Sequence, residues 1–147
     1  MNKEDKIEKI KLLARNFGLN NDEHLIEAFD VTKIYNRATN SKGAYANSAL
    51  ATLGDAVIKL HIVNTAFKCN LDSGGISRIR SECEKNDKLA WVCKIKDYPQ
   101  LLYCEKKQST DSIYDDPASL LEAIVGAIFI DKGFSETSKI LDAEIPI

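Results

Sequence analysis

The chain has 147 residues, a formal net charge of −2 and 44% hydrophobic residues, a composition typical of one ordinary globular domain. No apolar run approaches the roughly 20 residues that cross a bilayer, and the charged start MNKEDKIEKIKLL lacks the apolar core of a signal peptide. We therefore expect one cytoplasmic domain over residues 1–147, with no membrane association and no global basic field for nucleic acids.

Apolar residues recur at spacings of three and four along most of the chain, which predicts an all-α fold. The first helix is predicted over residues 3–16, with Gly18 as its stop, and the second over residues 22–30. After a loop near residues 39–45, residues 48–67 predict a long, half-buried helix. The buried stripe of that helix is predicted to contain Leu50, Leu53, Val57, Leu60 and Asn64.

Two shorter helices are predicted in the middle of the chain. A turn at residues 72–75 breaks the chain before a basic helix over residues 76–85, and another helix follows over residues 86–96. Trp91, in the second of these helices, has helical apolar neighbours. We therefore expect Trp91 to be a core side chain rather than a stacking platform.

The last third of the chain predicts a central buried helix. Asp116 and Pro117 mark its start, because a carboxylate caps the free amides and a proline at the first helical position gives up a donor that has no partner. Residues 118–131 are apolar almost all round, which is typical of a helix at the centre of a domain. A short final helix is predicted over residues 135–141.

Two acidic residues, Asp55 and Glu122, interrupt the apolar faces of the two longest predicted helices. An unpaired charge is costly to bury in such a place. Gly54 and Gly126 lie nearby, and because a mid-helix glycine costs about 1 kcal/mol, they indicate a close approach of backbones or ligands. Converging carboxylates predict a divalent-cation site, since Mg²⁺ takes oxygen ligands. The alternative is that each acid pairs with a basic side chain or a backbone amide and serves the structure only.

Four segments, in order along the chain, resemble the ribonuclease III family. NSALATLGDAVIKLHI resembles the family's signature helix, and SLLEAIVGAIFIDKGF resembles its late acidic helix. NRATNS and GGISRIRSECEKNDKLAWVCK are similar to two further family segments, so the resemblance runs from about Asn36 to Phe134. It implies an all-α ribonuclease III-type domain that forms a homodimer along the signature helix and recognises double-stranded RNA.

In this family, two carboxylates on the signature helix and two on the late helix contribute to the metal site. The resemblance places one of each pair on Asp55 and Glu122, as catalytic residues and as ligands of Mg²⁺ or Mn²⁺. The other two positions fall on Ala51 and Ser119, which supply no carboxylate. The implied function is a slow, metal-dependent endoribonuclease, and the alternative is a non-catalytic double-stranded-RNA-binding or scaffolding homodimer of the same fold.

Duplex RNA is recognised mainly through its shape, phosphates and 2′ hydroxyls, so basic side chains are the features to seek. The best cluster in the sequence consists of Arg78, Arg80, Lys85 and Lys88. This cluster is either an RNA-binding surface or an ordinary solvated helix face. The resemblance covers a nuclease domain and no separate RNA-binding domain, so we expect modest affinity for RNA.

Overall fold

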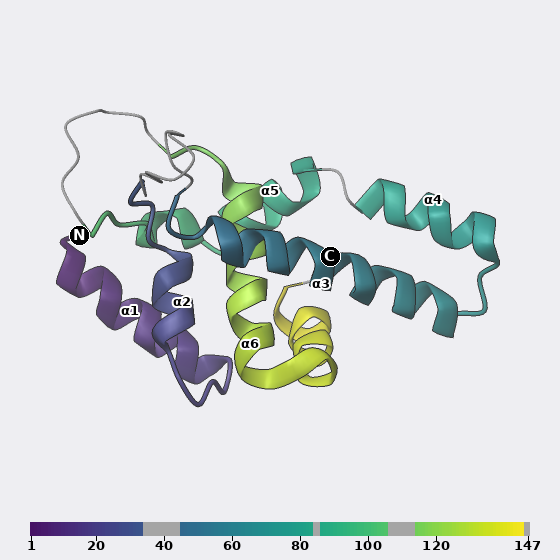
Figure 1. Ribbon diagram of the computed structural model, residues 1–147, viewed down its shortest axis with the longest axis horizontal. Coiled ribbons are helices and arrows are strands. Elements are labelled where there is room, and N and C mark those ends of the chain that lie inside the picture. The colour runs from purple at the N-terminus through teal and green to yellow at the C-terminus, as the bar shows by residue number, and fades with distance from the viewer. Residues whose placement is uncertain (34–44, 84–85, 106–113, 146–147) are drawn as a thin grey trace, which may run out of the picture.

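The computed structural model of the protein describes residues 1–33, 45–83, 86–105 and 114–145 (Figure 1). Its elements are α1 (Lys3–Asn16), α2 (Glu23–Ala28), α3 (Ser48–Lys68), α4 (Ser73–Cys83), α5 (Asn86–Ile95), the 3-10 helix η1 (Tyr98–Leu101) and α6 (Pro117–Glu144). Over these ranges the only β structure is two isolated bridges, so the all-α prediction is confirmed. None of the described helices combines the length and apolar character that a membrane crossing requires.

The centre of the fold is the crossing of α3 and α6. A Cβ atom added to Gly54 would lie 1.6 Å from the carbonyl oxygen of Glu122, and one added to Gly126 would lie 2.2 Å from the carbonyl oxygen of Leu50. Only glycine lets two helix backbones approach so closely. The close approach predicted from these two glycines is therefore confirmed. It also brings together Asp55, next to Gly54, and Glu122, one turn before Gly126.

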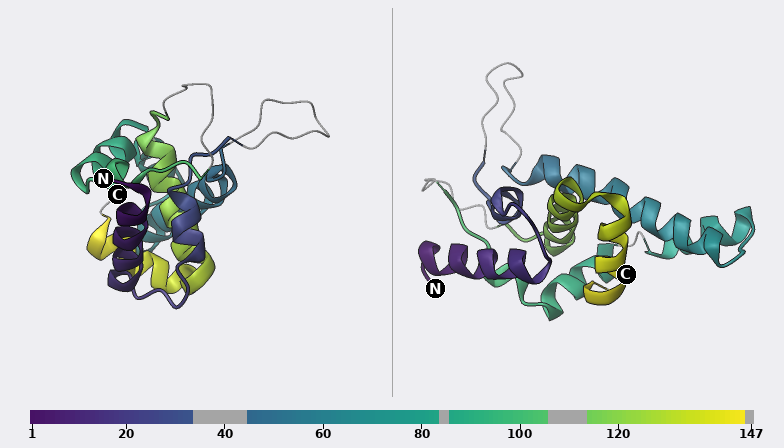
Figure 2. Two further views of the ribbon diagram at one scale, coloured as in Figure 1. Left: turned by 90° about the vertical axis from the view of Figure 1, so that its left-hand side faces the viewer. Right: turned by 90° about the horizontal axis from the view of Figure 1, so that it is seen from below.

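The first half of α6 is the most buried element. Leu120, Leu121, Ile124 and Ile128 are all completely buried, as predicted for residues 118–131. The right-hand view of Figure 2 shows this half of α6 between α3 and α5, with α1 and α2 toward one side. A helix packed on several sides needs apolar residues around its circumference, which explains its sequence.

Gly133 bends α6 back toward α3. Its backbone is non-helical, with φ of 76° and ψ of 177°, and the hydroxyl of Thr137 donates to its carbonyl oxygen at 2.6 Å. The predicted helix over residues 135–141 is thus the continuation of α6 beyond this kink. Two residues of α6 after the kink, Ser138 and Asp142, contact the buried His61 of α3. His61 Nδ1 lies 2.6 Å from Ser138 Oγ, and His61 Nε2 lies 3.2 Å from Asp142 Oδ1.

Two predicted core positions are wrong. Leu60 is 52% exposed and Trp91 is 63% exposed. The buried face of α3 instead includes Gly54, which must face α6. The buried face of α5 consists of Leu89, Val92 and Cys93. Both helices carry apolar residues on more than one face, so their periodicity alone does not select the face that is buried.

The predicted turn at residues 72–75 is also shorter than expected. α4 already begins at Ser73, and Asp72 Oδ1 accepts a hydrogen bond from the Gly75 amide at 2.8 Å. An aspartate in this position satisfies a free amide at the start of a helix. The glycine pair therefore belongs to the first turn of α4 rather than to the break before it.

Candidate active site

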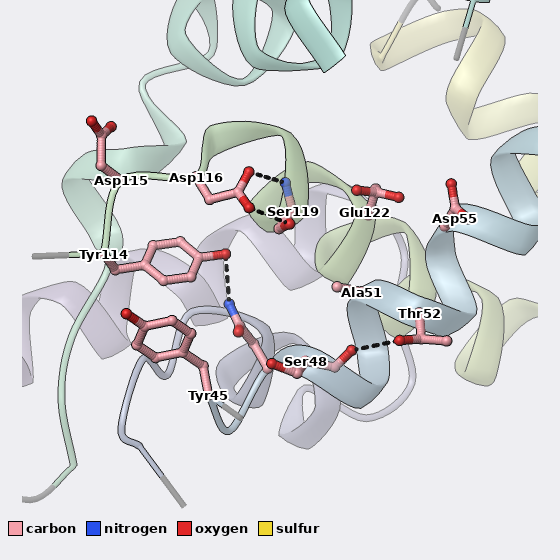
Figure 3. A pocket seen from close by; sticks show the side chains of 11 residues that line it. Tyr45, Ser48, Ala51, Thr52, Asp55, Tyr114, Asp115, Asp116, Ser119 and Glu122 are labelled. Atoms are coloured by element: carbon pink, nitrogen blue, oxygen red, sulfur yellow. Dashed lines mark hydrogen bonds between the residues drawn. The ribbon is translucent and has the colours of Figure 1, made fainter. Parts of the chain in front are cut away.

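A cavity of about 600 Å³ opens where the first turns of α3 meet the beginning of α6 (Figure 3). Its walls come from these two helices and from the segments that lead into them. The lining residues are Tyr45, Asn47, Ser48, Ala51, Thr52, Asp55, Tyr114, Asp115, Asp116, Ser119 and Glu122. Both predicted metal ligands, Asp55 and Glu122, lie in this one cavity.

Asp55 and Glu122 come from different helices and interact directly. Burial is the largest cause that raises the pKa of Glu122, and the hydrogen bond to Asp55 and the negative charge of Asp55 raise it further, to about 8. Asp116 adds a smaller effect of the same sign. At neutral pH Glu122 therefore carries a proton that it can donate to the Asp55 carboxylate.

Asp55 also has a basic partner on its own helix. Lys59 Nζ lies 3.0 Å from Asp55 Oδ2, one helical turn further along α3. The same ammonium lowers the pKa of Glu122, but by less than the causes that raise it. Asp55 thus meets the second carboxyl group and also pairs with a lysine. Lys59 was missed by the sequence reasoning, although its spacing of four residues from Asp55 indicates such a pair.

The two remaining family positions supply no charge to the cavity. Ala51 presents a methyl group, and the hydroxyl of Ser119 donates to Asp116 Oδ2 at 2.7 Å. Asp116 Oδ1 accepts from the Ser119 amide at 3.1 Å, so Asp116 caps α6 as predicted. A carboxylate occupied in this way by the helix start is a poor replacement for a missing metal ligand.

An aromatic pair forms the wall of the cavity that lies opposite the carboxylates. The rings of Tyr45 and Tyr114 meet edge to face, with centroids 4.8 Å apart. The buried Asn47 donates from Nδ2 to the Ala28 carbonyl at 3.0 Å and to the Tyr114 hydroxyl at 3.4 Å. No sequence signal places Tyr114 beside Tyr45 and Asn47, because Tyr114 comes from a segment far away in the chain.

The donor set fits a loosely held Mg²⁺ or Mn²⁺. Mg²⁺ is commonly bound by one or two carboxylates and completes its shell with water and substrate phosphates. Asp55 and Glu122 provide those two carboxylates in an open cavity. No cluster of three or more histidine, cysteine, aspartate or glutamate side chains suited to a metal occurs in the described part of the chain. A cation at this place would take its remaining ligands from water and phosphate oxygens.

The predicted basic cluster lies away from this cavity. Arg78 and Arg80 are exposed on α4, and Lys88 is exposed on α5, while Lys85 falls outside the described residues. α4 packs along the second half of α3, whereas the cavity lies at the first half (Figure 1). None of the three described side chains lines the cavity.

The sequence comparisons cover the same helices. The model of the ribonuclease III domain family matches residues 48–133, more than half of the chain. Ribonuclease 3 of Bordetella avium is 28% identical over 113 residues, which are 73% of this chain and 45% of that protein. Ribonuclease 3 of Syntrophotalea carbinolica is 28% identical over 132 residues, 86% of this chain and 56% of that protein. The chain thus spans about half the length of these curated relatives.

The fold comparison agrees with the sequence comparisons. The nuclease domain of ribonuclease III from Campylobacter jejuni superposes with a TM-score of 0.70 and 22% sequence identity, covering 92% of this chain and 95% of that one. At that identity the likeness shows a shared fold. The match of the domain model includes all of α3 and α6 up to its kink, the two helices that carry Asp55 and Glu122. By that match, this chain belongs to the ribonuclease III family.

Proposed function

We propose that this chain is an endoribonuclease domain that cleaves double-stranded RNA with the help of Mg²⁺ or Mn²⁺. The observation that supports this most is the meeting of Asp55 and Glu122, from two different helices, in one open cavity. Membership of the family supports the class of reaction. Because Ala51 and Ser119 supply no carboxylate, we expect slow cleavage that requires a high concentration of metal.

Asp55 and Glu122 would hold the cation, which when bound would stabilise negative charge on the scissile phosphate and activate water. Glu122 carries a proton at neutral pH, because its pKa is raised to about 8. Metal ligands must be deprotonated, so binding is expected to release this proton. Cleavage should consequently become faster as the pH rises toward 8.

A homodimer would place two such cavities along one RNA duplex. The nuclease domain from Campylobacter jejuni has a region involved in dimer formation. Because this chain shares its fold, we propose a similar assembly here. The exposed side chains of Arg78, Arg80 and Lys88 are the candidates for contacts with phosphates. A cytoplasmic location belongs to the same proposal.

A cleavage assay tests this function. Long duplex RNA is incubated with the protein in Mn²⁺ or Mg²⁺, and the products are separated on a denaturing gel. We expect cuts that depend on the metal, and a loss of at least a hundredfold in rate for Glu122→Gln and Asp55→Asn. The matched control is Glu136→Gln, since Glu136 is an exposed carboxylate of the same helix that pairs with Lys139 outside the cavity.

A second candidate is a non-catalytic dimer that binds duplex RNA. The observation that favours it is the replacement of two carboxylates, at Ala51 and Ser119, in the cavity itself. It predicts a shifted RNA band without cleavage products at any concentration of metal. RNA binding by the wild-type protein without cleavage at any metal concentration, and equal binding by Glu122→Gln, would replace the nuclease proposal.

A further inference from the structure

The carboxylate of Asp55 lies between two residues of unlike character on one face of α3. Ala51, one turn earlier, contributes only a methyl group to the cavity wall. Lys59, one turn later, contributes an ammonium group 3.0 Å from Asp55 Oδ2. Residues four apart share a helix face, so this face presents a paired anion and cation along the approach to the site.

The ammonium of Lys59 acts on both carboxyl groups of the site. It contacts Asp55 directly, and its charge also reaches Glu122. A divalent cation placed between Asp55 and Glu122 would be repelled by this ammonium and would compete with it for the Asp55 oxygen. At separations of about 4 Å, unit charges near a protein surface interact strongly enough to alter such an equilibrium.

The Asp55–Lys59 pair is also open to exchange. The side chain of Asp55 is 44% exposed and that of Lys59 is 45% exposed. An exposed pair of this kind is only marginally stable, because water and salt compete with it. Breaking this contact between Lys59 and Asp55 is therefore expected to cost little free energy.

The geometry points to Lys59 as an internal competitor of the divalent cation: its ammonium occupies the oxygen of Asp55 that the metal would take, and it thereby sets the metal affinity of the site. This inference rests on the proposed function, because it takes Asp55 and Glu122 as the ligands. The inference adds Lys59 to the site as the residue that determines the metal concentration at which the cation binds. Lys59 then swings away from Asp55 when the cation binds.

Direct titration with Mn²⁺, in the absence of RNA, tests this inference. Free Mn²⁺ is followed by its electron paramagnetic resonance signal for the wild-type protein, Lys59→Met and Lys59→Arg. We expect Lys59→Met to bind Mn²⁺ at least tenfold more tightly than the wild type, and Lys59→Arg, which keeps the charge, to stay within about twofold of it. Lys68→Met, which removes another exposed lysine of α3 far from the cavity, should change nothing.

Three further results decide the matter. Lys59→Met should have the same midpoint of thermal unfolding as the wild type, since Lys59 is half exposed. If Lys59→Met is less stable, the titration is repeated with Lys59→Gln. Equal Mn²⁺ affinity of Lys59→Met and the wild type, with binding lost in Glu122→Gln, overturns the role of Lys59 and leaves the proposed function intact. Absence of Mn²⁺ binding to every variant, including Lys59→Met, overturns both.

Discussion

Helices α3 and α6 are joined by two polar bridges of opposite character, one on each side of their glycine crossing. On the side of the kink, His61 meets Ser138 and Asp142, so that nitrogen and oxygen atoms with complementary hydrogen-bonding roles face one another. On the side of the cavity, two carboxyl groups, Asp55 and Glu122, face one another. The first bridge stabilises the fold, whereas the second is tolerated only with a bound proton, a lysine or a cation, which is characteristic of a functional site.

The crossing itself is expected to be the most sensitive point. Gly54→Ala would place a Cβ atom 1.6 Å from the backbone oxygen of Glu122. Because this clash is with backbone, no change of side-chain rotamer can relieve it. We expect a loss of more than about 4 kcal/mol in the free energy of unfolding, or no folded protein at all. Urea denaturation measures this change.

Gly74→Ala is the matched control for the crossing. A Cβ atom at Gly74 would have its nearest neighbour, Asp72 Oδ1, at 3.7 Å, so this variant should be unchanged or slightly more stable. If Gly54→Ala were as stable as Gly74→Ala, the two helices would not cross as closely as described.

The complementary bridge ranks next in expected effect. His61 is 5% exposed, and its replacement by alanine removes both of its polar contacts and leaves a cavity. We expect His61→Ala to lower the free energy of unfolding by about 2–4 kcal/mol. Ser138→Ala keeps the imidazole in place and should cost about 1 kcal/mol. Equal effects of the two variants would show that the imidazole does not link α3 to the end of α6.

Removing the acidic group of the Asp55–Glu122 pair should raise the free energy of unfolding, whereas replacing His61 lowers it. Because the pKa of Glu122 is raised from its ordinary value of 4.5 to about 8, the folded state binds more protons than the unfolded state between these pH values. Stability contributed by the protonated group is present below pH 4.5 and is lost as the pH rises through 8.

Glu122→Gln should therefore be more stable than the wild type at pH 8 when measured with a chelator present. Glu122 is only partly buried, so we expect a gain of about 1–2 kcal/mol after allowance for solvent screening. Thermal unfolding at several pH values measures this gain. If Glu122→Gln were less stable than the wild type at pH 8, Glu122 would be a satisfied structural group.

The kink that brings Ser138 to His61 gives the smallest expected effect. Thr137 is completely buried, and its hydroxyl donates to the Gly133 carbonyl at 2.6 Å. Thr137→Val keeps the shape of the side chain and removes this bond, so we expect a loss of about 1 kcal/mol. Chemical denaturation measures it. A neutral result would mean that the backbone of Gly133 holds the bend without this bond.

The helix pattern was largely predictable because it depends on local signals. The first predicted helix coincides with α1, and the predicted start of the central buried helix at Asp116 and Pro117 is correct. Caps and periodicity belong to neighbouring residues, so they can be read from the sequence. The burial of Leu60 and Trp91 was predicted wrongly, since it depends on which face meets another helix.

The site was only partly predictable for the same physical reason. Asp55 and Glu122 attract attention because each is a charge in an apolar helix. The sequence does not place Tyr114 beside Asn47, because that contact exists only after α2, α3 and the segment before α6 have packed together. Contacts between distant segments carry no periodic signal.

A crystal soaked in Mn²⁺ gives the most direct test of the carboxylate site, because anomalous scattering locates the ion without reference to activity. We predict a peak between the carboxylates of Asp55 and Glu122, with Lys59 moved away from Asp55. A map with Mn²⁺ bound elsewhere and none at this cavity, and with the contact between Lys59 and Asp55 intact, would contradict the assignment of these two residues as metal ligands.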